Sequence, residues 1–130
     1  MYFKTFEEIE VWQAARLLMR KVRIFTRRAM EKKDWGWADQ VTRSTLSIMA
    51  NIAEGNDAQT NVEFIMYLGY AKRSGAETRS HLYYGLDEGY VLKEEFEDTI
   101  QLCRKITAQL GKLIQYLQQH RAAKHRGVSS

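Results

Sequence analysis

The sequence of 130 residues contains no proline and a single cysteine. Proline is the commonest helix breaker, so its absence favours long, uninterrupted helices. The lone Cys103 excludes an internal disulfide, and no Cys/His spacing indicates a structural metal or another cofactor, which favours a reducing compartment. No apolar run approaches the length of a membrane span, and the first residues lack the apolar region of a signal peptide. We therefore expect one cytoplasmic domain that does not enter a membrane.

Positive charge is concentrated in one segment of the chain. The net charge is +4, but residues 16–33 alone contain eight basic residues and one acid, Glu31. The rest of the chain is therefore net acidic. Such an uneven distribution indicates an acidic partner for one face of the protein.

Apolar residues recur at spacings of three and four along four segments, which predicts four amphipathic helices. The first helix, over about 6–32, begins at a capping box formed by Thr5 and Glu8. The second follows a connector over 33–37 and ends at Gly55, which suits the C′ position of a helix cap. The core positions predicted for the first and third helices are Val11, Ala15, Leu18, Val22, Phe25, Ala29, Phe64, Leu68, Ala71, Gly75, Thr78 and Leu82.

The third helix opens at a second capping box, Thr60 and Glu63, and the fourth covers about 93–119. Four such helices joined by short loops predict an all-α protein, an antiparallel up-down-up-down four-helix bundle over residues 1–119. Residues 120–130 are basic and nearly devoid of apolar side chains, so we expect a disordered tail there.

Four arginines lie on the side of the first helix opposite its apolar positions. Arg16, Arg20, Arg23 and Arg27 fall within about 60° of one another when each residue advances about 100°. Guanidinium groups match phosphate oxygens, so this pattern predicts salt-sensitive binding of nucleic acid. The alternative is a solvated outer face whose arginine stems cover apolar surface.

The second helix contains polar residues where burial is expected. Asn51 and Glu54 share a helix face within an apolar stretch, with Ser47 one turn earlier and Arg43 another turn back. One interpretation is a ligand or nucleic-acid site. The favoured interpretation is a structural polar network in which Glu54 pairs with Arg43 or with Arg79 and fixes the helix register.

Aromatic residues suggest two further roles. Trp35 and Trp37 flank Gly36 in the predicted connector, where they either stack on unpaired bases or, more often in such bundles, close the end of the core. Several sides of the third helix bear tyrosines, which we interpret as a subunit interface: Tyr67, Tyr70, Tyr83 and Tyr84.

Enzymatic motifs are not evident. A di-iron bundle requires two Glu-x-x-His motifs, whereas this chain offers Glu77 with His81 four residues later. Cys103 falls on a core position without an activating base. We therefore expect neither catalytic residues nor a bound metal.

The chain resembles the four-helix-bundle family of proteins encoded within intervening sequences of bacterial large-subunit ribosomal RNA genes, also called S23 ribosomal proteins. The most specific element is the string Ala-Asn-Ile-Ala-Glu-Gly at residues 50–55. Two departures from the family pattern are Met49 in place of a common proline and Lys93 in place of a serine or threonine. The likeness covers about residues 5–118 and is strongest at 10–15, 40–55, 63–68 and 77–90.

The family is related to the accessory proteins of diversity-generating retroelements, which are basic pentameric rings that associate with a reverse transcriptase and its nucleic acid. The resemblance therefore implies a non-enzymatic homo-oligomer, a pentamer on this likeness, that binds RNA or DNA as an accessory factor to a reverse transcriptase or a ribosomal RNA insert. The alternative is a protein-interaction scaffold that recognises an acidic protein and binds no nucleic acid.

Overall fold

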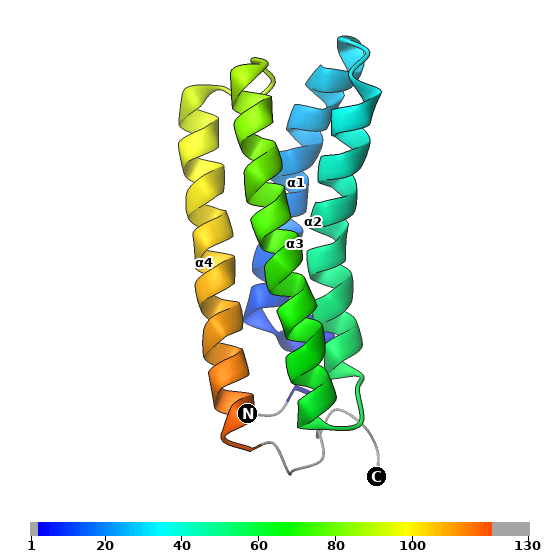
Figure 1. The fold of residues 1–130 in the computed structure, drawn as a ribbon, viewed down its shortest axis with the longest axis vertical. Helices are drawn as coiled ribbons and strands as arrows, with labels where there is room; N and C mark the ends of the chain where they lie inside the picture. Colours follow the sequence, from blue (N-terminus) through cyan, green and yellow to red (C-terminus); the bar gives the residue numbers. More distant parts are fainter. Residues whose placement is uncertain (1–2, 121–130) are drawn as a thin grey trace.

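The computed structural model of the protein describes residues 3–120, and it forms an antiparallel four-helix bundle. Helices α1 and α3 run in one direction and α2 and α4 in the other, with α1 behind α3 in Figure 1. Each helix packs against the next along the chain, and α4 closes the ring against α1. The predicted all-α up-down-up-down bundle is confirmed. The helices are α1 (Glu10–Glu31), α2 (Trp35–Asn56), α3 (Asn61–Asp87) and α4 (Lys93–Gln118).

The start of the first helix differs from its prediction. Glu8 accepts a hydrogen bond from the backbone N–H of Thr5 at 3.2 Å, but this box opens only the short 3-10 helix η1 (Phe6–Glu8). Ile9 is extended, with φ −80° and ψ 117°, and α1 begins one residue later. The buried Ile9 side chain explains the break, because the extended backbone directs it into the core.

The end of α2 also differs. Gly55 is not a C′ residue, since the helix continues through Asn56. The glycine is required for packing instead: a Cβ there would lie 2.6 Å from Cδ1 of Phe64 and 3.0 Å from Cβ of Tyr67. Gly55 therefore lets α2 and α3 approach closely near their connection.

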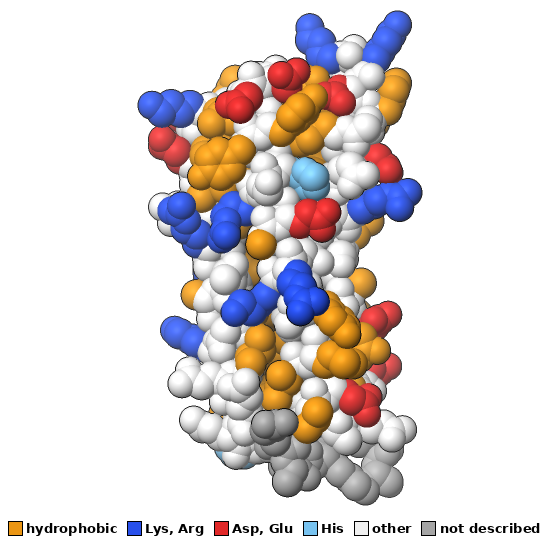
Figure 2. Space-filling view, in the orientation of Figure 1, with side chains coloured by type: hydrophobic (Ala, Val, Ile, Leu, Met, Phe, Trp, Pro, Cys, Tyr) orange, Lys and Arg blue, Asp and Glu red, His pale blue; other side chains and the backbone are white. Residues whose placement is uncertain are grey.

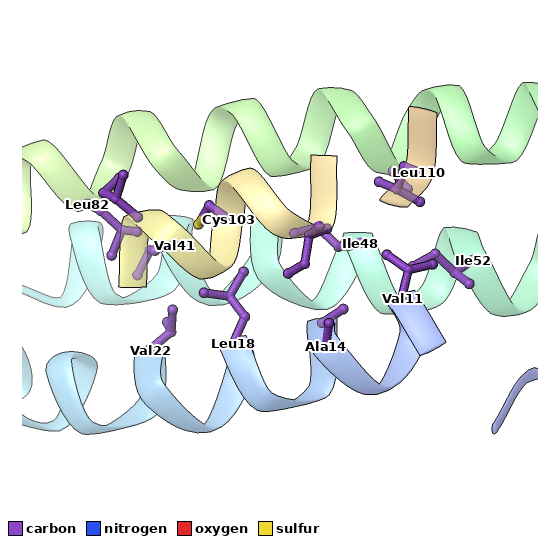
Figure 3. Close-up of a cluster of buried hydrophobic side chains, with 14 of the residues drawn as sticks. Val11, Ala14, Leu18, Val22, Val41, Ile48, Ile52, Leu82, Cys103 and Leu110 are labelled. Atoms are coloured by element: carbon purple, nitrogen blue, oxygen red, sulfur yellow. The ribbon is translucent and has the colours of Figure 1, made fainter. Parts of the chain in front are cut away.

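The core runs along the bundle axis and receives side chains from every helix. Figure 3 shows Leu18 of α1, Ile48 of α2, Leu82 of α3 and Cys103 of α4 pointing towards this axis. All twelve core positions predicted for the first and third helices are buried. Burial of these apolar surfaces is the main stabilising contribution expected for the fold.

At the end of the bundle opposite the α1–α2 turn, a polar contact joins α3 to the end of α4. The Asn61 side-chain amide donates a hydrogen bond to the backbone carbonyl of His120 at 2.8 Å. Residues 121–130 of the predicted tail lie outside the described residues.

Candidate nucleic-acid interface

The four arginines form a continuous stripe along the outer face of α1, which we call the arginine stripe. Arg16, Arg20 and Arg27 are exposed. Arg23 is half-buried, and its guanidinium donates to Oγ1 of Thr26 at 3.4 Å. From Arg16 to Arg27 the stripe covers about 16 Å at about 1.5 Å per residue.

No carboxylate neutralises the arginine stripe within residues 3–120. The ion pairs of this part of the chain all involve other residues: Lys21–Asp98 at 2.6 Å, Arg28–Glu95 at 2.6 Å, Arg43–Asp39 at 3.0 Å and His81–Glu77 at 3.6 Å. The stripe is therefore a concentration of uncompensated positive charge on one side of the subunit.

Two other basic residues of α1 turn towards α4. The guanidinium of Arg28 forms two hydrogen bonds with the carboxylate of Glu95, at 2.6 and 2.9 Å, and a third with the carbonyl of Tyr90. The hydrogen bonds with Arg28 lower the pKa of Glu95, and those with Glu95 raise the pKa of Arg28. Lys21 pairs with Asp98 one turn further along α4. The basic segment thus divides into a part that binds α4 and a part that faces outward.

The structural polar network predicted on α2 is formed only in part. Asn51 is half-buried, and its Nδ2 donates to the Ser47 carbonyl at 2.8 Å and to Ser47 Oγ at 3.0 Å. Ser74 of α3 donates its hydroxyl to the same Oγ at 2.8 Å. A short chain of hydrogen bonds therefore joins α2 to α3, and Ser74 is a member that the sequence pattern did not reveal.

Glu54 and Arg43 lie outside this network, contrary to the prediction. Both side chains are exposed, and Arg43 pairs with Asp39 on its own helix. The reason is geometric: Asn51 turns towards the α2–α3 seam, and Glu54, three residues later, is rotated by about 60° towards solvent. Glu54 is therefore not a buried charge that requires a partner.

The two tryptophans near the start of α2 have different environments. Both lie in the first turn of the helix and not in a connector, because Asp34 is the N-cap and its Oδ1 accepts from the Trp37 N–H at 3.3 Å. Trp37 is 6% exposed and closes this end of the core, with its Nε1 donating to the His81 carbonyl at 2.9 Å. Trp35 is 59% exposed. Only Trp35 is available to a ligand.

Asp34 also joins the two turns at this end of the bundle. Its Oδ2 accepts hydrogen bonds from the hydroxyls of Tyr84 and Tyr90, both at 2.9 Å. The hydrogen bond from Tyr90 is the main cause of a lowered pKa for Asp34, whereas desolvation and the same bond raise the pKa of Tyr90 to about 12. The preference of aspartate for N-cap positions makes the capping role of Asp34 predictable from the sequence. Its hydrogen bonds to the two tyrosines are not predictable, because no local sequence pattern indicates them.

Groups with catalytic or metal-binding chemistry are dispersed. Within residues 3–120 no three His, Cys, Asp or Glu side chains come together as metal ligands. Burial raises the pKa of the Cys103 thiol to about 11, so the thiol remains protonated at neutral pH. None of the described helices combines the length and apolarity needed to cross a membrane.

The fold and this face define a four-helix bundle whose first helix, α1, bears unpaired arginines on its outer side. The family described as 23S rRNA-intervening sequence protein matches residues 7–112, and the chain belongs to this family. A crystal structure of a protein of unknown function from the S23 ribosomal protein family of Bacteroides thetaiotaomicron is similar, with a TM-score of 0.73 and 28% identity. The match covers 80% of this chain and 97% of that one. No curated protein matches this chain in sequence.

Proposed function

We propose that the protein is a non-enzymatic, self-associating bundle that binds RNA or DNA through the arginine stripe. The observation that carries this proposal is the absence of any acid paired with the stripe among the described residues, while Lys21 and Arg28 on the same helix are paired. The family description refers to an insert of 23S rRNA, which is consistent with a nucleic-acid partner.

The geometry of the stripe suits a phosphate backbone. Successive phosphates of one duplex strand are about 3.4 Å apart along the axis, so a stripe of about 16 Å spans about five of them. Contacts of this kind are made to phosphate oxygens and position the protein without reading the sequence. We therefore expect binding with little sequence preference.

Neutralising the stripe tests this function. In the triple variant Arg16→Gln, Arg20→Gln, Arg27→Gln, three exposed cations are removed and the bond from Arg23 to Thr26 is kept. If each arginine displaces one counterion from duplex DNA, the slope of log affinity against log salt becomes shallower by about 2.7, or by about 2 for a single strand. Fluorescence anisotropy with labelled duplex and single-stranded oligonucleotides at several salt concentrations measures the slope for the wild type and for the variant.

A charge-matched control removes three exposed lysines from α4, as Lys93→Gln, Lys105→Gln, Lys112→Gln. We expect this control to keep most of the salt dependence of the wild type. Equal effects of the two triple variants would reject a specific role for the stripe. A partner from cell extract that remains bound after nuclease treatment, with no affinity for oligonucleotides, would favour the protein scaffold instead.

The surface proposed for self-association is the outer face of α3. Val62, Met66 and Tyr70 follow one another at four-residue spacing and are 48%, 46% and 40% exposed. Figure 2 shows hydrophobic side chains gathered on the face of the bundle that α3 occupies, with Lys and Arg side chains between them. Burying such a strip against a second copy removes apolar surface from water.

Placing a charge in this strip is expected to dissociate the assembly. Met66→Asp puts a carboxylate where a second copy covers apolar side chains, and desolvating an unpaired charge is costly. Native mass spectrometry should give a multiple of 15.2 kDa for the wild type, five copies according to the family resemblance, and one copy for the variant. Leu92→Asp, at an exposed apolar site in the α3–α4 turn, is the control and should assemble normally. A wild type that remains one 15.2 kDa chain at micromolar concentration would end this part of the proposal.

A further inference from the structure

A hollow lies between α1 and α2 at the end of the bundle where these helices are joined. Arg23 and Met30 of α1 and Trp35, Asp39 and Thr42 of α2 contribute to its lining. Its volume of about 580 Å³ falls within the range of about 300–1,000 Å³ typical of small-molecule sites. The hollow opens to solvent, so a ligand would enter it from the surface of the bundle.

The indole of Trp35 is the most exposed aromatic ring near the stripe. It contacts no other aromatic ring within residues 3–120, in contrast to Trp37, whose ring lies against Tyr84 and Tyr90. The adjacent Gly36 leaves space as well, since a Cβ built there would meet no atom within 4 Å. The exposure of the indole and the open space at Gly36 leave room for a planar group beside Trp35.

The hollow and the arginine stripe are continuous, because Arg23 belongs to both. Asp39, the acid at the edge of the hollow, is paired with Arg43 at 3.0 Å, and this pairing reduces its repulsion of an anion. The site thus combines an open aromatic ring with a cationic path that leads to it. Proteins that hold unpaired nucleic-acid strands combine these two elements, a basic groove for the backbone and an aromatic ring for a base.

We propose that an unpaired nucleobase stacks on Trp35 in this hollow while the phosphates that flank it lie on the arginine stripe. The ligand class is then a single strand, or a duplex with an unpaired base at its end or in a bulge. This inference rests on the proposed binding of nucleic acid and specifies which form is preferred. It also assigns to Trp35 a role different from that of its buried neighbour Trp37.

The test compares single-stranded RNA, single-stranded DNA and a blunt duplex as anisotropy probes for the wild type and two variants of Trp35. Loss of one base–aromatic stack weakens binding about fivefold or more. Trp35→Ala should therefore weaken binding of both single strands by at least about fivefold and leave the duplex unchanged. Trp35→Phe keeps an aromatic ring and should restore most of the affinity. The salt slope should be the same for all three proteins, because Trp35 carries no charge.

Leu92→Ala is the control, since Leu92 is an apolar residue 60% exposed in the α3–α4 turn and lies outside both the stripe and the hollow. Its variant should bind every probe as the wild type does. If Trp35→Ala binds single strands as tightly as the wild type, the base-stacking site is wrong. If the triple variant of the arginine stripe still loses affinity in that case, the proposed binding of nucleic acid stands. A wild type that binds none of the probes would reject both.

Discussion

Replacing Phe64 with alanine is expected to lower the free energy of unfolding by about 3–5 kcal/mol. The side chain is fully buried in the seam between α2 and α3, where its ring fills the space left by the missing side chain of Gly55. Removing the ring sacrifices its burial and leaves a cavity that long helices cannot collapse to fill. Urea denaturation followed by far-ultraviolet circular dichroism measures the change.

Because Gly55 and Phe64 approach so closely, substitutions at these two residues should not have additive effects on the free energy of unfolding. Gly55→Ala alone is expected to destabilise by about 1–3 kcal/mol, because its Cβ would lie 2.6 Å from the Phe64 ring. In the Phe64→Ala background the same change should cost clearly less, since only the 3.0 Å approach to Cβ of Tyr67 remains and alanine is the better helix former by about 1 kcal/mol. Gly69→Ala in α3 is the control: an added Cβ meets no atom there within 4 Å, so this change should stabilise. Additive effects of the first two substitutions would contradict the packing described for this seam.

Replacing Trp37 with alanine is expected to have an effect of similar size, again about 3–5 kcal/mol. The indole closes one end of the core and packs so tightly on α3 that a Cβ at Gly85 would lie 2.7 Å from its Cζ2. The substitution also leaves the His81 carbonyl without the hydrogen bond from Nε1. Thermal unfolding followed by circular dichroism gives the loss as a lower midpoint temperature.

Trp35→Ala provides the comparison for this substitution on the same turn of α2. Its side chain is exposed, so its removal is expected to change the free energy of unfolding by no more than about 0.5 kcal/mol. Trp37→Phe should fall between the two, because it keeps much of the apolar burial but lacks the Nε1 donor. Equal losses for the alanine variants at Trp35 and Trp37 would contradict the different environments described for the two rings.

Local sequence pattern predicted much of the fold because the relevant signals act within one helix. The three-four spacing identifies the buried faces of α1 and α3, and the Thr60 half of the predicted capping box forms, its hydroxyl accepting from the Glu63 N–H at 3.1 Å. The apolar pattern is less clear in α2, where Leu46 is exposed because it is rotated by about 160° from the buried Ile48. The prediction that Gly55 ends α2 is wrong, because glycine occurs both at helix ends and at close helix contacts, and only the position of Phe64 distinguishes the two.

The candidate site was less predictable for a related reason. Helical geometry placed the four arginines on one face, but whether they are paired depends on acids distant in the sequence. Arg28 finds Glu95, 67 residues later, whereas no described acid reaches the stripe. The contrast between Trp35 and Trp37 likewise depends on α3, which covers one ring and not the other.

Polar contacts at both ends of the bundle have a mechanical consequence for any bound polymer. Asp34 ties the α1–α2 turn to the end of α3 and its following turn, and Asn61 ties the start of α3 to the end of α4. With the helices fixed lengthwise, the backbone positions of the four arginines along α1 are fixed as well. Any change of shape needed for a match must then come mainly from the bound strand, so a ligand whose phosphates already have a similar spacing binds at the smallest conformational cost.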